Sequence, residues 1–173
     1  DQTLDSDYML DLLKFFRKIS IYLKFTTNNF EKIMKTLMII KTQKMKRIKL
    51  IANISDVNAI GDEFINNDCI NKINIYPPVS FIQAEAFRGC ISLKIIKFPN
   101  CLTSIEHSLF RICENLKRLV IPPKVESIGP DALRGCHNLI EVSIPPSVKK
   151  IGKSCFRGDN HIEHITLPEN LIL

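Results

Sequence analysis

The chain has 173 residues, of which 24% are charged and 45% hydrophobic. This is the composition of one folded domain, and it excludes a large multidomain enzyme and a disordered chain. The net charge of +6 arises in residues 1–49, which hold 11 basic and 5 acidic residues; the other 13 basic and 13 acidic residues cancel. Residues 50–173 therefore have no electrostatic bias toward nucleic acid, and we predict no specific nucleic-acid partner.

The longest uncharged stretch after the N-terminal third is residues 73–84, which Pro77 and Pro78 interrupt. A membrane-spanning helix needs roughly 20 apolar residues, so no membrane span is predicted. The acidic start of the chain differs from a basic, apolar signal peptide, and a first residue other than Met indicates a processed form or a fragment. Both the cell surface and the cytoplasm stay open as locations.

Residues 1–47 predict a helical hairpin. Ser6 or Asp7 can cap a first helix whose apolar residues lie three or four apart. These residues are Tyr8, Met9, Leu12, Leu13, Phe16, Ile19 and Leu23. A second helix would contain Phe30, Ile33, Met34 and Leu37. We expect the hairpin to cover one end of the domain that follows. Alternatively, the pattern of Leu4 to Phe16 followed by Phe30 and Ile33 resembles an F-box, which would make the chain an intracellular adaptor.

Residues 41–49 contain five basic residues and join the predicted hairpin to the rest of the chain. We expect a solvated linker here, with a nuclear-targeting signal or a contact to an anionic surface as the alternatives. The chain thus divides into an N-terminal cap, residues 1–47, and a second domain, residues 48–173.

Residues 82–173 consist of four stretches of 23 residues that align without a gap. An earlier, degenerate copy begins near Leu50. The recurring positions form columns of like residues. They include Phe87, Phe110, Leu133 and Phe156; Cys90, Cys113 and Cys136; Ile96, Leu119, Val142 and Ile165; and Pro99, Pro122, Pro145 and Pro168.

Each copy contains one short strand, because apolar residues alternate with period two and the run ends at a proline. The rest of each copy has room only for a tight turn or a brief helical segment. A single copy cannot cover its own apolar side, whereas stacked copies form one continuous core. We therefore predict an α/β repeat fold: a solenoid of about five 23-residue coils, each adding roughly 4.8 Å.

These repeats resemble the BspA-type leucine-rich repeat family, a surface-antigen-like group with the consensus L-x-x-I-x-L-P followed by V-x-x-I-G-x-x-A-F-x-x-C. The resemblance implies a leucine-rich-repeat solenoid and a cell-surface or secreted, adhesion-type interaction protein rather than an enzyme. The chain departs from the pattern at Ile112, which replaces a glycine, at Asp159 in the cysteine column, at Tyr76 in the proline column and at Cys155 in the alanine column.

The six cysteines predict reduced thiols rather than disulfides. Cys90, Cys113 and Cys136 share one column, where stacked Cβ atoms about 4.8 Å apart exceed the separation that a disulfide prefers. The sequence has no C-x-x-C pair, and His161 and His164 lack a third ligand in register, so we predict no metal site and no cofactor. No catalytic motif appears, and we predict that the chain is not an enzyme.

The outward positions of the strands form the first candidate binding surface. Leucine-rich repeats generally bind partners on this sheet, so the resemblance implies a protein or glycan ligand here, with an undecorated solvated surface as the alternative. The candidate residues run from basic to acidic along the coils: Lys72, Lys94, Ile95, Lys97, Lys117, Arg118, Glu141 and His164.

An arginine column is the second candidate. It comprises Arg88, Arg111, Arg134 and Arg157, one residue after the phenylalanine column. Guanidinium groups at roughly 5 Å intervals repel one another unless acids or bound anions intervene, which predicts a site for phosphate or acidic glycans. Duplication of a repeat without a functional requirement is the alternative.

The last residues, Glu169 to Leu173, follow the last predicted strand and its proline. Exposure of Leu167, Leu171, Ile172 and Leu173 beside an unpaired strand edge favours association, so we expect that the chain is a fragment or pairs end to end with another copy.

Overall fold

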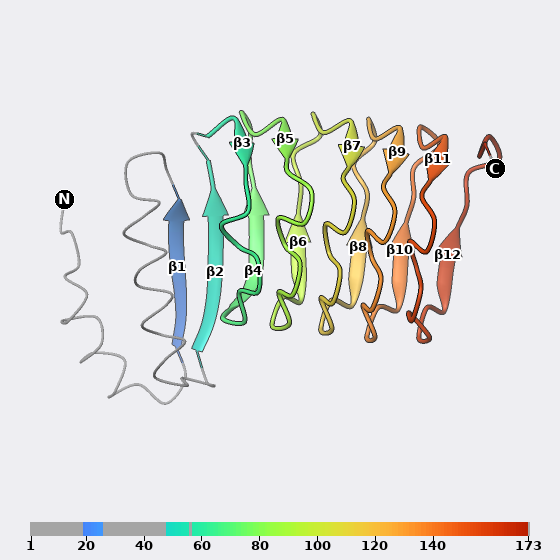
Figure 1. The fold of residues 1–173 in the computed structure, drawn as a ribbon. Helices are drawn as coiled ribbons and strands as arrows, with labels where there is room; N and C mark the ends of the chain where they lie inside the picture. Colours follow the sequence, from blue (N-terminus) through green and yellow to red (C-terminus); the bar gives the residue numbers. More distant parts are fainter. Residues whose placement is uncertain (1–18, 26–47, 56, 173) are drawn as a thin grey trace.

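In the computed structural model, residues 19–25, 48–55 and 57–172 are described, and their regular elements are twelve parallel-paired β-strands that build a solenoid (Figure 1). The strands are β1 (Ile19–Phe25), β2 (Ile48–Ile54), β3 (Ala59–Ile60), β4 (Ile70–Ile75), β5 (Phe81–Ile82), β6 (Ile95–Lys97), β7 (Ser104–Ile105), β8 (Arg118–Val120), β9 (Ser127–Ile128), β10 (Glu141–Ser143), β11 (Lys150–Ile151) and β12 (His164–Thr166). The solenoid has about five coils, as predicted. Figure 1 shows the strands β2, β4, β6, β8, β10 and β12 in one row and the shorter odd-numbered strands from β3 to β11 in a second row.

Strand register confirms the 23-residue coil. Lys72 pairs with Ile95 between β4 and β6, and Glu141 pairs with Arg118 on one side and with His164 on the other. Each pair joins residues 23 apart, so one copy of the repeat makes one turn of the solenoid.

The expected helical hairpin is not supported. Ile19 and Leu23, which were placed on its first helix, lie in β1, which runs parallel to β2 and extends its sheet. No helix occurs in the parts of the chain that the structure describes, so the fold there is β rather than α/β. The other residues of the hairpin, the F-box-like pattern and residues 41–47 of the basic linker lie outside the described residues, whereas Ile48 and Lys49 of that linker lie in β2. A domain boundary at residue 47 stays a prediction.

Buried side chains repeat from coil to coil and form one core. Phe64, Phe87 and Phe110 are fully buried, with ring centroids 5.7 Å apart between successive rings. The expected cysteine column is also buried. Burial of apolar surface contributes roughly 25 cal/mol per Å², so these columns supply most of the stabilisation.

A third hydrogen-bonded ladder takes the place of the brief helical segment considered above. Along it, the N–H groups of Phe87, Phe110 and Leu133 donate to carbonyl groups of the following coil at 2.7–3.1 Å. In each coil the chain along this ladder has left-handed backbone at two positions, one in the column of Glu85 and one in the column of Ile112.

The first two rows of strands are interrupted between the same pair of coils. In the first row, β6 and β8 belong to separate sheets, and in the second row β5 and β7 do so as well. Only the third ladder continues there, since Phe87 N–H still donates to the Leu109 carbonyl at 3.1 Å. We call this interruption the seam.

Candidate binding surface

The strand face consists of the outward residues of β4, β6, β8, β10 and β12. In β6 and β8 the central residues Ile96 and Leu119 are buried and their neighbours are exposed. Ile95 and Val120 are accordingly 49% and 67% exposed. The pleat therefore projects Ile95 outward as predicted, together with the neighbouring cations.

Most of the predicted outward residues are exposed, with one correction on β4. Asn74 lies two residues after Lys72, where the period-two alternation of a strand would also turn it to solvent, but it is only 8% exposed. Its side-chain amide donates to Asn53 Oδ1 at 2.8 Å, and the two residues are register partners on β4 and β2. Cross-strand amide pairing accounts for this burial. Lys72, on the same strand, is half-buried.

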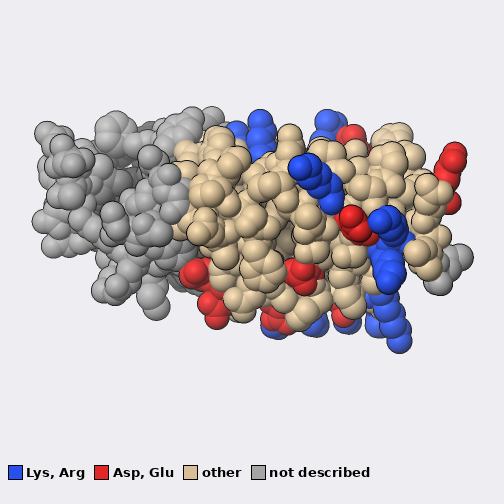
Figure 2. All heavy atoms as spheres, turned by 90° about the horizontal axis from the view of Figure 1, so that it is seen from above, with Lys and Arg blue, Asp and Glu red and all other residues tan. Residues whose placement is uncertain are grey.

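Charge changes sign along the strand face. The cations on β6 and β8 give way to Glu141 on β10, whose Oε2 lies 3.3 Å from Arg118 Nε. His164 on β12 is exposed. Figure 2 shows the solenoid from above, where basic and acidic side chains of the described residues are interspersed and form no continuous patch of one sign.

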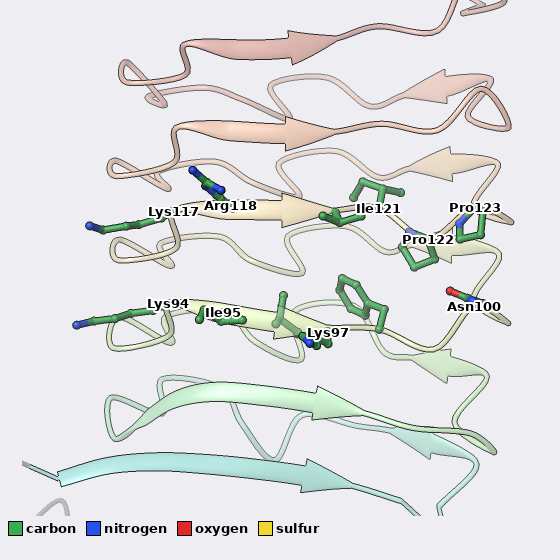
Figure 3. A pocket seen from close by; sticks show the side chains of 12 residues that line it. Lys94, Ile95, Lys97, Asn100, Lys117, Arg118, Ile121, Pro122 and Pro123 are labelled. Atoms are coloured by element: carbon green, nitrogen blue, oxygen red, sulfur yellow. The ribbon is translucent and has the colours of Figure 1, made fainter. Parts of the chain in front are cut away.

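A cavity of about 740 Å³ opens at the seam, between β6 and β8. It brings together five of the predicted binding residues, namely Lys94, Ile95, Lys97, Lys117 and Arg118. The other lining residues are Ile96, Phe98, Asn100, Val120, Ile121, Pro122 and Pro123. In Figure 3, Lys94 and Lys117 point the same way at one end, and Asn100 and the two prolines lie at the other. Lys72, Glu141 and His164 do not line the cavity.

We attribute the seam to two substitutions within the repeat. Phe98 stands where the neighbouring copies have isoleucine, and its ring packs edge-on against Phe110 of the next coil, with centroids 5.9 Å apart. A phenyl ring needs more room than an isoleucine side chain and so separates the coils. Glu106 stands where the next two copies have Gly129 and Gly152. Both glycines donate N–H to the preceding coil, at 2.8 and 2.7 Å, and no described residue gives Glu106 the equivalent bond.

A smaller cavity of about 330 Å³ adjoins the first. The two cavities share Lys97, Phe98 and Asn100, and the smaller one continues past Tyr76 on the preceding coil. Together they form an elongated depression, which we call the basic groove.

The arginine column lies apart from the basic groove. Arg88 pairs with Glu85 at 2.9 Å and Arg134 with Asp131 at 3.3 Å, as their proximity in sequence suggested. In the two other copies Ser108 and Ser154 occupy the acidic position. Arg111 and Arg157 form no ion pair within the described part of the chain, so paired and unpaired arginines alternate along the column, and an anion site there stays a prediction.

The buried thiols of the cysteine column donate hydrogen bonds, and these thiols and the buried Cys155 are protonated. Burial raises the pKa of Cys90 and Cys155 to about 12 and raises the pKa of Cys113 and Cys136 well above the ordinary value. Cys136 Sγ donates to the Phe110 carbonyl, whereas the neighbouring His137 contacts the Gly158 carbonyl. A protonated thiol is a poor nucleophile, and the two side chains do not face each other.

Asp159 occupies the cysteine column in the last coil. Its Oδ1 accepts a hydrogen bond from Cys136 N–H at 2.7 Å, and its buried Oδ2 has no partner. Burial raises the pKa of this carboxyl to about 6, against the opposing effects of that hydrogen bond and of His137. Asp159 therefore also contacts the preceding coil, but it accepts a hydrogen bond from an N–H group where the cysteines of the column donate to a carbonyl group.

Two further properties concern only the described part of the chain. No three His, Cys, Asp or Glu side chains gather there in a metal-binding arrangement. Nor does that part contain a helix long and apolar enough to cross a membrane.

Solved structures share this fold. A leucine-rich cell surface protein from Faecalibacterium prausnitzii is 30% identical over 65% of this chain, with a TM-score of 0.64. A leucine-rich repeat protein from T. pallidum is 28% identical over 65% of this chain, with a TM-score of 0.62. The matches span 30% and 56% of those two proteins. A leucine-rich repeat protein from Eubacterium ventriosum, 23% identical with a TM-score of 0.64, shares the fold.

Among curated proteins, none matches the sequence significantly. The family model of the BspA type leucine-rich repeat region, in contrast, matches residues 58–172 with six copies. The match covers most of the chain and coincides with the strands from β3 to β12. With its repeat columns, its coil register and this match, the chain belongs to the BspA-type leucine-rich repeat family.

Proposed function

We propose that the chain is a non-catalytic interaction module of the surface-protein type, which binds a protein or glycan partner on its strand face. One observation carries this proposal: the strand face holds an open cavity in which exposed aliphatic side chains, Ile95 and Val120, lie among four cations. Ligand sites are typically concave and apolar, with a few polar or charged groups that orient the ligand.

Two further observations support the proposal. The similar protein from Faecalibacterium prausnitzii is described as a cell surface protein. The buried, protonated thiols and the separation of Cys136 Sγ from His137 give no support to nucleophilic catalysis. Binding of a partner needs no reactive side chain and accounts for the exposed apolar residues of the strand face.

The proposal is tested by binding of the full 173-residue chain to a glycan array and to a displayed peptide library. A variant with Ile95→Asp, Val120→Asp and His164→Asp alters the strand face at three exposed positions. We expect the wild-type chain to retain specific ligands and the variant to lose them. Lys153→Glu, an exposed change at a residue outside the strand face, is the matched control. Equal binding by the triple variant, or no ligand in either format, would contradict the proposal.

A further inference from the structure

The cavity between β6 and β8 has an apolar interior. Ile96 and Ile121 are buried at its base, Phe98 is half-buried, and Ile95 and Val120 remain largely exposed. Covering the two exposed aliphatic side chains would remove apolar surface from water, which favours a ligand that carries an apolar group. A volume of about 740 Å³ is ample for an aliphatic or aromatic side chain.

The rim of this cavity is positively charged, and the positive charges of its lysines are not balanced by acidic side chains of the described residues. Lys94, Lys97 and Lys117 form no ion pair with any residue in the described ranges, and no acidic residue lines the cavity. Arg118 does contact Glu141, but its side chain is 76% exposed and remains available to a ligand. Like charges grouped in this way repel one another, so an acidic ligand would relieve the repulsion.

The spacing of the strands determines how a ligand can lie. Cα atoms of β6 and β8 approach within 8 Å of one another, whereas an inserted strand would require about 9.6 Å between them. A partner strand therefore cannot complete the sheet between β6 and β8. A ligand must lie across the strand face and insert a side chain, and the continuation of the basic groove toward Tyr76 favours an elongated one.

The aliphatic lining of the larger cavity favours a peptide ligand over a nucleic acid or a glycan. Single-stranded nucleic acids and sugars are commonly held on exposed aromatic rings. Within the larger cavity, where the anchoring side chain inserts, the exposed apolar groups are Ile95 and Val120, and the one aromatic residue, Phe98, is half-buried. The exposed aromatic ring of the basic groove, Tyr76, lines the smaller cavity instead. Such a lining suits Leu, Ile or Phe side chains of a polypeptide.

Building on the proposed function, we infer that the basic groove binds an extended acidic peptide segment of a protein partner. The segment inserts one aliphatic or aromatic side chain between β6 and β8. Flanking Asp or Glu residues contact Lys94, Lys97 and Lys117 at the rim. The ligand is thus defined by an apolar anchor between acidic neighbours.

The test selects ligands for the full chain from a displayed library of random dodecapeptides. We expect the selected peptides to be enriched in Asp and Glu around a Leu, Ile or Phe. Resynthesised peptides should lose roughly tenfold or more in affinity with Lys97→Glu and with Val120→Asp, because a charge pair or the apolar contact is replaced by repulsion or desolvation. Lys153→Glu should leave the affinity unchanged, and raising the salt concentration should weaken binding. Unaltered melting temperatures of the variants exclude unfolding.

Other outcomes separate this inference from the proposed function. Peptides without acidic enrichment, or peptides that the two groove variants bind as well as the wild type, would overturn the inference. If binding is instead lost with Ser143→Arg or His164→Glu on β10 and β12, a strand-face module remains and the basic groove is not its site. The inference would also be overturned if the selection yields no peptide while a glycan binds in a way that requires Lys97. Failure of both peptides and glycans would overturn both proposals.

Discussion

The thiol of Cys113 donates a hydrogen bond to the carbonyl oxygen of Phe87, 26 residues earlier in the chain, at an Sγ–O distance of 3.1 Å. Cys90 makes the equivalent bond to Phe64, and Cys136 to Phe110, at 3.1 and 3.2 Å. Each thiol thus links the turn of one coil to the backbone of the preceding coil. Each of these carbonyl groups also accepts a backbone N–H within its own turn, as the Phe87 carbonyl does from Cys90 at 3.2 Å, so the thiol adds a second hydrogen bond that joins the two coils.

This arrangement predicts the accessibility of the thiols. In the folded chain a thiol reagent should react readily with Cys101, which is exposed, and slowly with the buried Cys90, Cys113, Cys136 and Cys155. After denaturation all six cysteines should react, and reducing agent should not change the melting temperature. Rapid reaction of the buried thiols in the native state would contradict the core assignment. A stoichiometry below six after denaturation would reveal a disulfide.

Phe110→Ala should lower the free energy of unfolding by about 3 to 5 kcal/mol, because it removes a fully buried ring and leaves a cavity. That ring stacks on Phe87 with an interplanar angle of 12° and also contacts Phe98. Phe81→Ala, at a side chain that is 49% exposed, is the matched control and should have a much smaller effect. Denaturant unfolding measures both. Similar losses for the two variants would argue against a core of stacked rings.

Ile112→Gly should stabilise the chain by about 1 kcal/mol, because a β-branched residue is strained in left-handed backbone. Ile112 has φ of 64°, and the same column position in the next coil is Gly135 at 79°. Gly135→Ala is the reciprocal test and should destabilise the chain. An added Cβ there would have no neighbour closer than 3.7 Å, so the change isolates the backbone effect. Thermal melting that shows opposite signs for the two variants supports the assignment, and destabilisation by Ile112→Gly would contradict it.

Asp159 predicts a decline in stability as the pH rises. Its pKa is about 6 in the folded chain against an ordinary value of 3.8, so the native state binds the proton more tightly than the unfolded state. The free energy of unfolding contributed by this group therefore falls between about pH 4 and pH 6. Asp159→Asn should remove that decline and exceed the wild type in stability most clearly above pH 6. Denaturant unfolding at several pH values measures the difference, and a gap between the two proteins that does not widen with pH would disprove the assignment.

The open edge of β12 predicts association of the 173-residue chain. In the described structure β12 pairs only with β10, and Leu167 and Ile172 are 54% and 61% exposed. An unpaired strand beside apolar surface favours contact between copies. Light scattering should show an average mass that increases with concentration, and Leu167→Lys with Ile172→Lys should reduce it. Val120→Lys is the control at a distant exposed residue. A constant monomer mass would exclude this pairing.

The coil and its core could be predicted because every copy repeats the same apolar columns. Phe87 and Phe110 are buried, and the period of 23 residues is reproduced by the register of Lys72 with Ile95. Within such a repeat, local pattern and tertiary packing specify the same arrangement. The outward direction of Ile95 followed from the period-two alternation of its strand.

The strand β1 was missed because its sequence satisfies two periods. Ile19 and Leu23 are four residues apart, as on a helix, but Ile19, Ile21, Leu23 and Phe25 also alternate. Pairing with β2 decides between the two, and that interaction joins segments remote in sequence. The alternation and the β-branched residues were the available signal.

The cavity could be anticipated only in part. Phe98 and Glu106 differ visibly from the other residues of their columns. Gln83, however, also stands in the column of Gly129 and Gly152, and its N–H still donates to the Ile60 carbonyl at 2.8 Å. Whether a departure separates two coils depends on how the larger side chain packs against the next coil. The contact between Phe98 and Phe110 is such a packing outcome.

The seam has a consequence for how the molecule unfolds. In a linear array, cooperativity passes from each coil to the next through their shared interface. Two of the three hydrogen-bonded ladders stop at the seam, one between β6 and β8 and the other between β5 and β7, so fewer hydrogen bonds couple the two halves of the array there. The coils before the seam and those after it then unfold as two cooperative units that are only weakly coupled to each other. A ligand that touches both β6 and β8 spans the seam, and it would fasten the two into one mechanical unit.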